Sequence, residues 1–294
     1  MYYRRKIILA LLQILGGQID KISLQKLLFL VTRRQVKPHY DFVPYRYGCY
    51  SFSVNADLST MITKGLLSET ATHFIKVDTK DFLKELKEDD RKLLMSVKNQ
   101  YGHLSAHALM KHTYINFPYW AINSIKAAQI LDAEQLKNVQ NSRTVSDKCI
   151  LFTIGYEGLS LEEYLNRLIR NDVKLLVDVR NNPLSMKFGF SKKQLKTYCF
   201  SVGINYLHFP EVGIQSNQRR ELNDQSDYDH LFYNYAKEIL PQTLTTQEKI
   251  VKLLDENKRI ALTCFEANIC QCHRKPLAEA ISNLPDFNFE VKHI

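Results

Sequence analysis

From Cys149 to the end of the chain, short apolar runs alternate with longer segments that carry apolar residues on a helical period. Runs of strand length occupy residues 149–155, 173–180, 204–208 and 259–264, with a last one at 287–293. Helical patterns occupy residues 160–169, 191–202, 228–240, 245–257 and 275–281. This alternation predicts an α/β domain with a largely parallel sheet, and it places a ligand site at the carboxyl ends of the strands.

The first part of the chain follows a different pattern. Residues 4–15 and 54–62 have helical periodicity, and a further helix is expected to begin at Ser23 as its N-cap. The aromatic stretch 40–53 suits short strands, and the mixed charges of residues 70–100 suit an exposed helix. We therefore predict a mainly helical, winged-helix-like domain over residues 1–131, a polar linker over 132–148 and the α/β domain over 149–294.

Length and cysteine usage limit the class of protein. A chain of 294 residues is long enough for two domains, each with its own core. The six cysteines are scattered and half of them lie in one segment, which does not match the disulfide framework of a secreted protein. The apolar run 7–15 is read as a helix, because no cleavage site follows and no run approaches the roughly 20 apolar residues of a membrane span. We expect reduced thiols and a cytosolic location.

The formal net charge of +9 favours a polyanionic partner. A solvated basic surface explains the same excess, so charge alone leaves both interpretations open. In the first domain the candidate contacts to nucleic acid are Arg4, Arg5, Arg33, Arg34, Lys37 and Arg46. The expected partner is nucleic acid, DNA in particular, or a regulatory protein, and no membrane partner is expected.

Short motifs in the first domain are similar to those of a known family. They are Leu24–Leu30, Tyr45–Ser51, Asp57-Leu58 with Gly65-Leu66-Leu67, Leu104–His107 and Pro118-Tyr119-Trp120. Together they resemble the winged-helix-like domain called Panacea, which is known from antitoxin and phage-associated proteins. The resemblance implies a helix-turn-helix type of fold and either DNA binding or protein–protein regulation. Alternatively, Lys26 and Tyr47 within these motifs are simply core-edge and turn residues.

Polar residues and glycines follow four of the expected strands. These strand ends carry Gly155-Tyr156-Glu157-Gly158, then Asp178-Val179-Arg180 with Ser185, then His208 with Glu211, and finally Cys264 with Glu266. The last segment continues to Cys272-His273-Arg274 before a helical pattern begins. Because parallel strands end at one edge of a sheet, we expect one cleft surrounded by Glu157, Arg180, His208, Glu211, Glu266 and Arg274.

The same strand-end motifs, in this order, resemble the family known as domain of unknown function 488. That resemblance implies an α/β domain with a polar site, and it implies no particular activity. The chain departs from the family pattern at two places. The family usually has a basic residue directly after the serine of the second motif, where this chain has Met186 before Lys187. The glycine-rich turn after the third motif is reduced to Gly213 beside Ile214.

The residue types at the strand ends suggest chemical roles. The candidate ligand contacts are Gly155, Tyr156, Arg180, Ser185 and Arg274, in which the arginines are forked donors suited to phosphate. The candidate acids, bases, proton carriers and nucleophiles are Glu157, Asp178, His208, Glu211, Glu266, Cys272 and His273. Cys272 or His273 is expected to supply a nucleophile or a proton relay, and Cys272 suits the first role because a thiol near a helix start has a lowered pKa.

Two other interpretations compete with a polar catalytic site. Cys264, Cys270, Cys272 and His273 are metal-ligand types, but zinc sites usually use two pairs of ligands spaced by two to four residues. We therefore expect neither a bound metal nor another cofactor. In a purely structural interpretation, Asp178 pairs with Arg180 or Arg274, Glu266 bonds loop N–H groups and the cysteines pack as small apolar residues.

The leading hypothesis is an enzyme, a hydrolase or transferase, that acts on a phosphate-bearing ligand such as a nucleotide or nucleic acid. In this hypothesis the first domain recruits nucleic acid or a partner protein to the α/β domain. The alternative is a protein without catalytic activity, either a regulator that senses a small anion in the same site or a protein-interaction module. Turnover of the ligand separates the two hypotheses.

Overall fold

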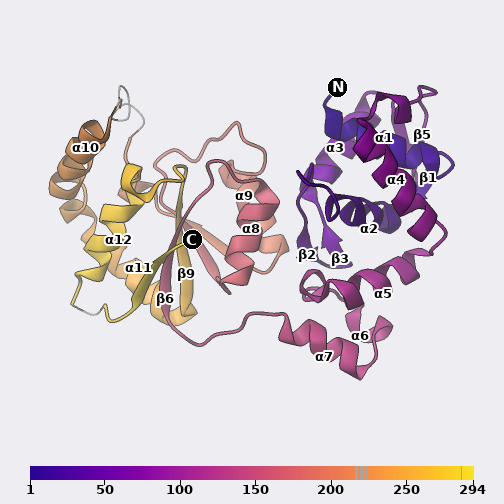
Figure 1. Ribbon diagram of the computed structural model, residues 1–294. Helices are drawn as coiled ribbons and strands as arrows, with labels where there is room; N and C mark the ends of the chain where they lie inside the picture. Colours follow the sequence, from indigo (N-terminus) through magenta and orange to yellow (C-terminus); the bar gives the residue numbers. More distant parts are fainter. Residues whose placement is uncertain (216–217, 219–221, 223, 286) are drawn as a thin grey trace. The chain divides into compact units, whose positions relative to one another are not determined.

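A computed structural model describes residues 1–215, 218, 222, 224–285 and 287–294. The chain divides into two compact units, Met1–Arg143 and Thr144–Ile294, and each is described by itself (Figure 1). Within the described residues, no helix combines the length and the apolar character that crossing a membrane requires.

The first unit is mainly helical, as the sequence predicts. Its helices are α1 (Tyr3–Ile14), α2 (Lys21–Thr32), α3 (Phe52–Thr63), α4 (Glu88–Tyr101), α5 (Ala106–Asn116), α6 (Ala127–Ile130) and α7 (Ala133–Asn141). Its strands are β1 (Gln18–Asp20), β2 (Val43–Tyr45), β3 (Gly48–Tyr50), β4 (Leu67–Glu69) and β5 (His73–Lys76). Strands β1, β5 and β4 form an antiparallel sheet in that order, and β2 pairs with β3 in a separate hairpin.

Two local features of this unit differ from the sequence-based prediction. The N-cap of α2 is Asp20 and not Ser23, because one carboxylate oxygen of Asp20 accepts the N–H groups of Ile22 and Ser23 at 2.9 Å each. The segment expected as a linker forms α7, which starts with a reciprocal capping box between Asp132 and Gln135. Val139 of α7 is buried in a small core with residues of α5, so the first part of this polar segment belongs to the first unit.

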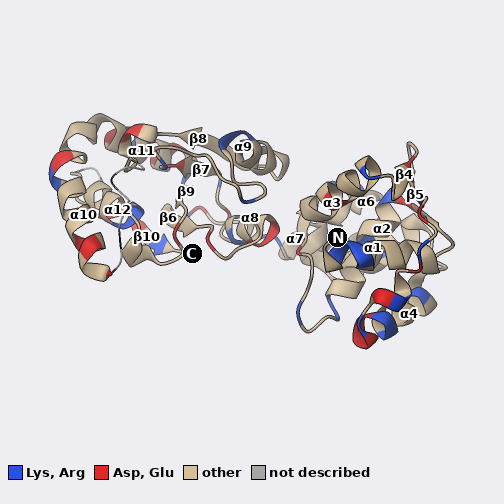
Figure 2. Ribbon diagram, turned by 90° about the horizontal axis from the view of Figure 1, so that it is seen from above, with Lys and Arg blue, Asp and Glu red and all other residues tan. Residues whose placement is uncertain are grey.

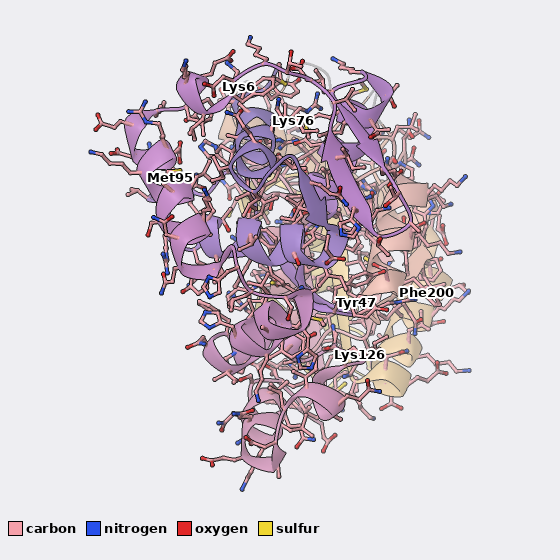
Figure 3. All side chains as sticks on the ribbon, turned by 90° about the vertical axis from the view of Figure 1, so that its right-hand side faces the viewer. Lys6, Tyr47, Lys76, Met95, Lys126 and Phe200 are labelled. Atoms are coloured by element: carbon pink, nitrogen blue, oxygen red, sulfur yellow. The ribbon has the colours of Figure 1, made fainter. Side chains whose placement is uncertain are left out.

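Helix α4 carries acidic residues in its first turn and basic residues directly after them, and both kinds are visible on it in Figure 2. This agrees with the exposed helix expected from the mixed charges of residues 70–100. The aromatic stretch 40–53 is largely buried. Tyr47, at the β2–β3 turn, is one of its exposed side chains (Figure 3).

A buried carboxylate fixes the N-terminal helix of the first unit. Asp57 on α3 is 1% exposed and accepts hydrogen bonds from Arg4 Nε and Arg5 Nε at 2.6 Å and from the Tyr40 hydroxyl at 2.8 Å. Burial alone raises the pKa of Asp57, but these three donors outweigh it and hold the pKa below its usual value. The two arginines therefore serve the packing of α1 against α3.

The second unit is an α/β fold, as predicted. Its strands are β6 (Ile150–Gly155), β7 (Leu175–Asp178), β8 (Asn205–His208), β9 (Arg259–Cys264) and β10 (Glu290–His293). They form one sheet in the order β10-β6-β9-β7-β8, and every neighbouring pair is parallel. The longer helices are α8 (Leu161–Arg170), α9 (Lys192–Ser201), α10 (Gln225–Glu238), α11 (Leu244–Asn257) and α12 (Arg274–Ser282).

Helices cover both faces of this sheet, with α8 and α9 on one side and α11 and α12 on the other (Figure 1). Val177 and Val179 at β7 pack into the same core as Leu254 of α11 and Ile281 of α12. On the opposite face, the Tyr164 hydroxyl of α8 donates to Thr263 Oγ1 at 2.7 Å. Alternating strand side chains therefore point to two separate layers.

Replacing Asp57 tests the buried network of the first unit. We expect Asp57→Asn to lower the free energy of unfolding by about 2 kcal/mol at neutral pH, because the charged acceptor of three hydrogen bonds is lost. The Asp57 pKa is depressed in the folded state, so its stabilisation is present above the unfolded pKa and is lost as pH falls through the folded value. The difference between the two proteins should shrink below about pH 4.

Urea unfolding followed by the fluorescence of Trp120, the chain's one tryptophan, measures this effect within the first unit. The exposed Asp89 of α4 supplies the control, and Asp89→Asn should change the unfolding free energy by less than about 0.5 kcal/mol. Equal effects of the two substitutions, or a difference that does not depend on pH, would contradict this interpretation.

Candidate functional site

The carboxyl ends of four strands meet at one edge of the sheet in the second unit. Gly155 of β6 pairs with Cys264 of β9, and Asp178 of β7 pairs with both Thr263 and His208 of its neighbouring strands. The polar residues that follow these strands are therefore brought to the same edge, as expected for parallel strands.

A buried ion pair organises the residues after β7. Asp178 is 0% exposed and Arg180 is 6% exposed. Arg180 Nε donates to Asp178 Oδ1 at 2.8 Å, and its Nη2 donates to Asp178 Oδ2 at 2.5 Å. The Tyr206 hydroxyl adds a bond of 2.6 Å to the same Oδ2. Burial disfavours the charged guanidinium, but the carboxylate beside it keeps the pKa of Arg180 above its usual range.

The remaining donors of Arg180 bond to the protein as well. Its Nη1 donates to the Tyr156 hydroxyl and to the Phe190 carbonyl, each at 2.9 Å. The Tyr156 ring stacks on Phe190 with centroids 4.3 Å apart. The sequence suggested that Arg180 holds phosphate, whereas the structure uses it to join β7, β6 and the segment before α9. The structural interpretation, in which Asp178 pairs with Arg180, describes this geometry better.

Arg274, the other candidate phosphate ligand, holds the loop after β9. It is 2% exposed, and its guanidinium donates to the carbonyls of Glu266 at 2.6 Å and Ala267 at 3.2 Å. The same loop is held from β6, because Glu157 Oε2 accepts the Ala267 N–H at 2.9 Å. Arg274 Nε is buried without a hydrogen-bond partner in the structure. Arg274 therefore connects the start of α12 to the loop after β9 through hydrogen bonds to backbone carbonyls.

The two arginines face opposite sides of the sheet edge. Val179 packs with α11 and α12, so its neighbour Arg180 points to the other side, where it reaches Phe190 before α9. Arg274 belongs to α12, and its Nη1 lies beside the point where a side chain of Gly155 would project. Strand alternation therefore sends the two guanidinium groups toward separate layers, and the cleft shared by all the expected residues stays a prediction.

Two thiols and an imidazole gather on the α12 side. Cys264 Sγ, Cys272 Sγ and a ring nitrogen of His273 lie within 4.8 Å of one another, and all three residues are buried. Cys264 Sγ is 3.6 Å from His273 Nδ1 and donates to Glu266 Oε2 at 3.1 Å. His273 Nε2 lies 2.9 Å from the Val179 carbonyl. Since that carbonyl only accepts, Nε2 carries the proton and Nδ1 faces the thiols in the neutral ring.

Burial reverses the expected property of Cys272. The sequence placed this thiol at a helix start with a lowered pKa, but Cys272 is fully buried and lies against Cys264 and Glu266. Burial, followed by these neighbours, raises the pKa of Cys272 well above its usual value. An unassisted nucleophile at Cys272 is therefore not supported, whereas the exposed Cys270 lies outside the group.

The other expected site residues have separate surroundings. His208 Nε2 donates to the Arg180 carbonyl at 2.8 Å, and His208 Nδ1 accepts from Lys192 Nζ at 2.9 Å. Ser185 Oγ accepts the Lys187 N–H at 3.2 Å. Glu211 bonds Thr246 Oγ1 at 2.9 Å, and that bond directs it toward α11.

A pocket of about 320 Å³ opens at the strand ends, where residues that follow β6, β7 and β9 line it. Its lining residues are Tyr156, Arg180, Asn181, Asn182, Leu184, Ser185, Met186, Ile214, Cys264 and Phe265. The amides of Asn181 and Asn182 are not among the site residues expected from the sequence, although both follow directly on the second strand-end motif. Lys187, the displaced basic residue of that motif, donates from Nζ to the Tyr156 carbonyl at 2.9 Å beside this pocket.

The candidate nucleic-acid contacts of the first unit differ in their bonding and exposure. Arg4 and Arg5 bond Asp57, and Arg34 Nη2 donates to Gln100 Oε1 at 2.8 Å and to the Tyr101 hydroxyl at 2.9 Å. The exposed members are Arg33, Arg34, Lys37 and Arg46. The guanidinium of Arg33 lies over the Trp120 ring, 5.3 Å from its centroid.

A comparison with protein families gives one match. Residues 160–281 match the family described as domain of unknown function DUF488, which supports the resemblance in the C-terminal half of the chain. A search of curated proteins finds no match. The resemblance of the first unit to the Panacea domain stays a prediction.

Gly155 provides a test of how tightly this edge is built. A Cβ atom there would lie 1.9 Å from the Glu266 carbonyl oxygen, whereas a Cβ at Gly158 would meet nothing within 4 Å. We expect Gly155→Ala to destabilise the second unit by about 3 kcal/mol or more, because the backbone at Glu266 would have to move away from the added methyl group. Gly158 has a φ of +75°, so Gly158→Ala should cost only about 1 kcal/mol.

Hydrogen exchange gives a local measurement of the same change. The N–H groups of Tyr156 and Glu157 bond the Phe265 carbonyl at 3.0 and 2.9 Å. Their exchange should accelerate more in Gly155→Ala than in Gly158→Ala. Equal protection of these two amides in both variants would show that the contact between Gly155 and the Glu266 backbone does not limit the site.

Proposed function

We propose that the second unit binds a phosphate-bearing ligand, a nucleotide or a segment of nucleic acid, in the pocket at the strand ends and acts on it as a hydrolase or transferase. The observation that carries this proposal is the lining of the pocket. The described residues that line it include amide and hydroxyl donors and no aspartate or glutamate, and Lys187 adds a cation beside it. A pocket of this kind favours an anion over a cation.

Hydrogen-bond donors at the rim would make the direct contacts. Arg180 is committed to Asp178, Tyr156 and Phe190, so its role is to shape the pocket. The donors at the rim are the amides of Asn181 and Asn182 and the hydroxyl of Ser185, on the segment after β7. Lys187 adds a cation beside the pocket, although burial lowers its pKa against a raising effect of Glu157.

Glu157 is the best-placed candidate for proton transfer. It is exposed at the end of β6 and interacts electrostatically with Lys187. One of its oxygens accepts the Ala267 N–H, and this bond orients the carboxylate. Asp178 is a poor candidate by comparison, because Arg180 and Tyr206 bond both of its oxygens. In this proposal Glu157 accepts or donates the proton of the reaction.

A second candidate function is an anion-sensing regulator or a protein-interaction module without turnover. The observation that favours it is the large share of polar groups at this edge that already bond the protein, including Asp178, Arg180 and Arg274. In either function the first unit recruits nucleic acid or a regulatory protein, and its exposed Arg33, Lys37 and Arg46 are the proposed contacts.

Binding of phosphate-bearing probes tests the proposed pocket. We expect the full chain to bind at least one member of a series of nucleoside mono-, di- and triphosphates and a short oligonucleotide in calorimetric titrations. Asn182→Asp should weaken that binding by roughly tenfold or more, because it places a negative charge at the rim. The matched control is Asn205→Asp, an exposed position at the amino end of β8, which should leave affinity unchanged.

Turnover of the bound probe separates the two functions. Release of a product that stops in Glu157→Gln, with binding retained, supports the enzyme. Binding without product supports the anion-sensing regulator. No binding by any probe, or equal loss in Asn182→Asp and Asn205→Asp, contradicts a phosphate-bearing ligand in this pocket.

Salt dependence tests the recruiting role of the first unit. If Arg33 and Lys37 contact DNA phosphates, the affinity of the full chain for a labelled duplex should fall steeply with salt. The double substitution Arg33→Ala with Lys37→Ala should reduce the log–log slope by about two, and Arg91→Ala on α4 serves as the control. An unchanged slope would leave a protein partner as the remaining proposal.

A further inference from the structure

We infer that Cys264, Cys272 and His273 form a binding site for one zinc ion, and that the carboxylate of Glu266 completes the site. This inference does not depend on which ligand the pocket at the strand ends binds, although Cys264 also lines that pocket. It replaces the expectation, drawn from residue spacing alone, that the chain carries no metal.

One separation between the ligand atoms already matches a tetrahedral zinc site, and the other two are bounded close to the required values. With Zn–S near 2.3 Å and Zn–N near 2.0 to 2.1 Å, a sulfur and a nitrogen ligand lie about 3.6 Å apart and two sulfurs about 3.8 Å apart. Cys264 Sγ and His273 Nδ1 are 3.6 Å apart, and all three ligand atoms lie within 4.8 Å of one another. Small side-chain movements would therefore place all three around one ion.

The imidazole is already oriented as a ligand. His273 donates its Nε2 proton to the Val179 carbonyl at 2.9 Å, which leaves Nδ1 as the nitrogen that faces the thiols. Metal-binding histidines commonly donate their other ring N–H to a carbonyl or a carboxylate in this way, because the bond fixes both the ring and its tautomer. Val179 is held in turn by its own N–H bond to the Thr263 carbonyl at 3.2 Å.

The surroundings favour a closed, four-ligand site. Cys264 is 1% exposed, and Cys272 and His273 are 0% exposed. Glu266 is partly exposed and its Oε2 lies 3.1 Å from Cys264 Sγ, so it can cover the group from the solvent side. Four protein ligands are typical of structural zinc sites. Such an ion would tie the end of β9 to the start of α12 across the loop 265–271.

Metal analysis of the full chain tests this inference. Protein produced with added zinc and then desalted should contain about one zinc ion per chain. Cys272→Ser and His273→Ala should each lose stoichiometric zinc, whereas Glu266→Gln should retain it more weakly. The matched control is Cys270→Ser, which removes an exposed thiol from the same loop and should keep full occupancy. The cobalt-loaded protein should show thiolate-to-metal charge-transfer absorption that disappears in Cys272→Ser.

A measurement on the unchanged protein guards against variants that fail to fold. X-ray absorption at the zinc edge should reveal a coordination shell with two sulfur and two lighter ligands, and a strong chelator should lower the melting temperature of wild type but not of Cys272→Ser. Wild type without zinc, equal zinc in wild type and Cys272→Ser, or equal loss in Cys270→Ser would overturn the inference. A shell of oxygen and nitrogen alone would overturn it as well.

Discussion

The geometry of the second unit depends on the buried ion pair between Asp178 and Arg180. Charges taken out of water are stable only when a partner and further hydrogen bonds compensate them. Here the carboxylate accepts from Arg180 and Tyr206, and the guanidinium also bonds Tyr156 and the Phe190 carbonyl. These partners come from β6, β8 and the segment before α9, so satisfying one ion pair fixes several parts of the sheet edge together.

This pair also separates the edge into two chemical environments. Side chains that alternate along β7 point to opposite layers, so the ion pair lies on the α8 and α9 side while Val179 packs against α11 and α12. The pocket with its amide rim lies beside the ion pair. Cys272 and His273 lie toward α12, where the carbonyl of Val179 orients His273, and Cys264 borders both environments because it also lines the pocket. One short segment, residues 178–180, thus supports both candidate sites.

Much of this fold is predictable because it depends on short-range patterns. Apolar runs predict the strands of the second unit, and the helical pattern over 160–169 matches α8, whose N-cap Ser160 accepts the Glu163 N–H at 3.0 Å. The exact start of a helix is less predictable. The sequence pattern favours Ser23 as the N-cap of α2, whereas Asp20 caps this helix in the structure. The polar helix α7 was missed because its few apolar residues face a small core that exists only in the folded unit.

The candidate site was less predictable, because it depends on which layer each side chain enters. Arg180 and Arg274 both follow predicted strands, so the sequence predicts the same role for both. In the structure Arg180 forms an ion pair with Asp178, whereas Arg274 bonds the loop after β9. Metal-ligand spacing failed as a criterion for a similar reason. Cys264 ends a strand while Cys272 and His273 precede a helix, and only the crossing of these two elements brings their ligand atoms together.

The dependence of the edge on its buried ion pair can be measured with a double-mutant cycle. Asp178→Ala and Arg180→Ala, each alone, should destabilise the second unit by about 3–5 kcal/mol in urea unfolding followed by circular dichroism, because each leaves the other charge buried and unpaired. If the pair organises the edge, the double variant should be more stable than the sum of the single effects by about 2 kcal/mol or more. Costs that simply add would contradict this account.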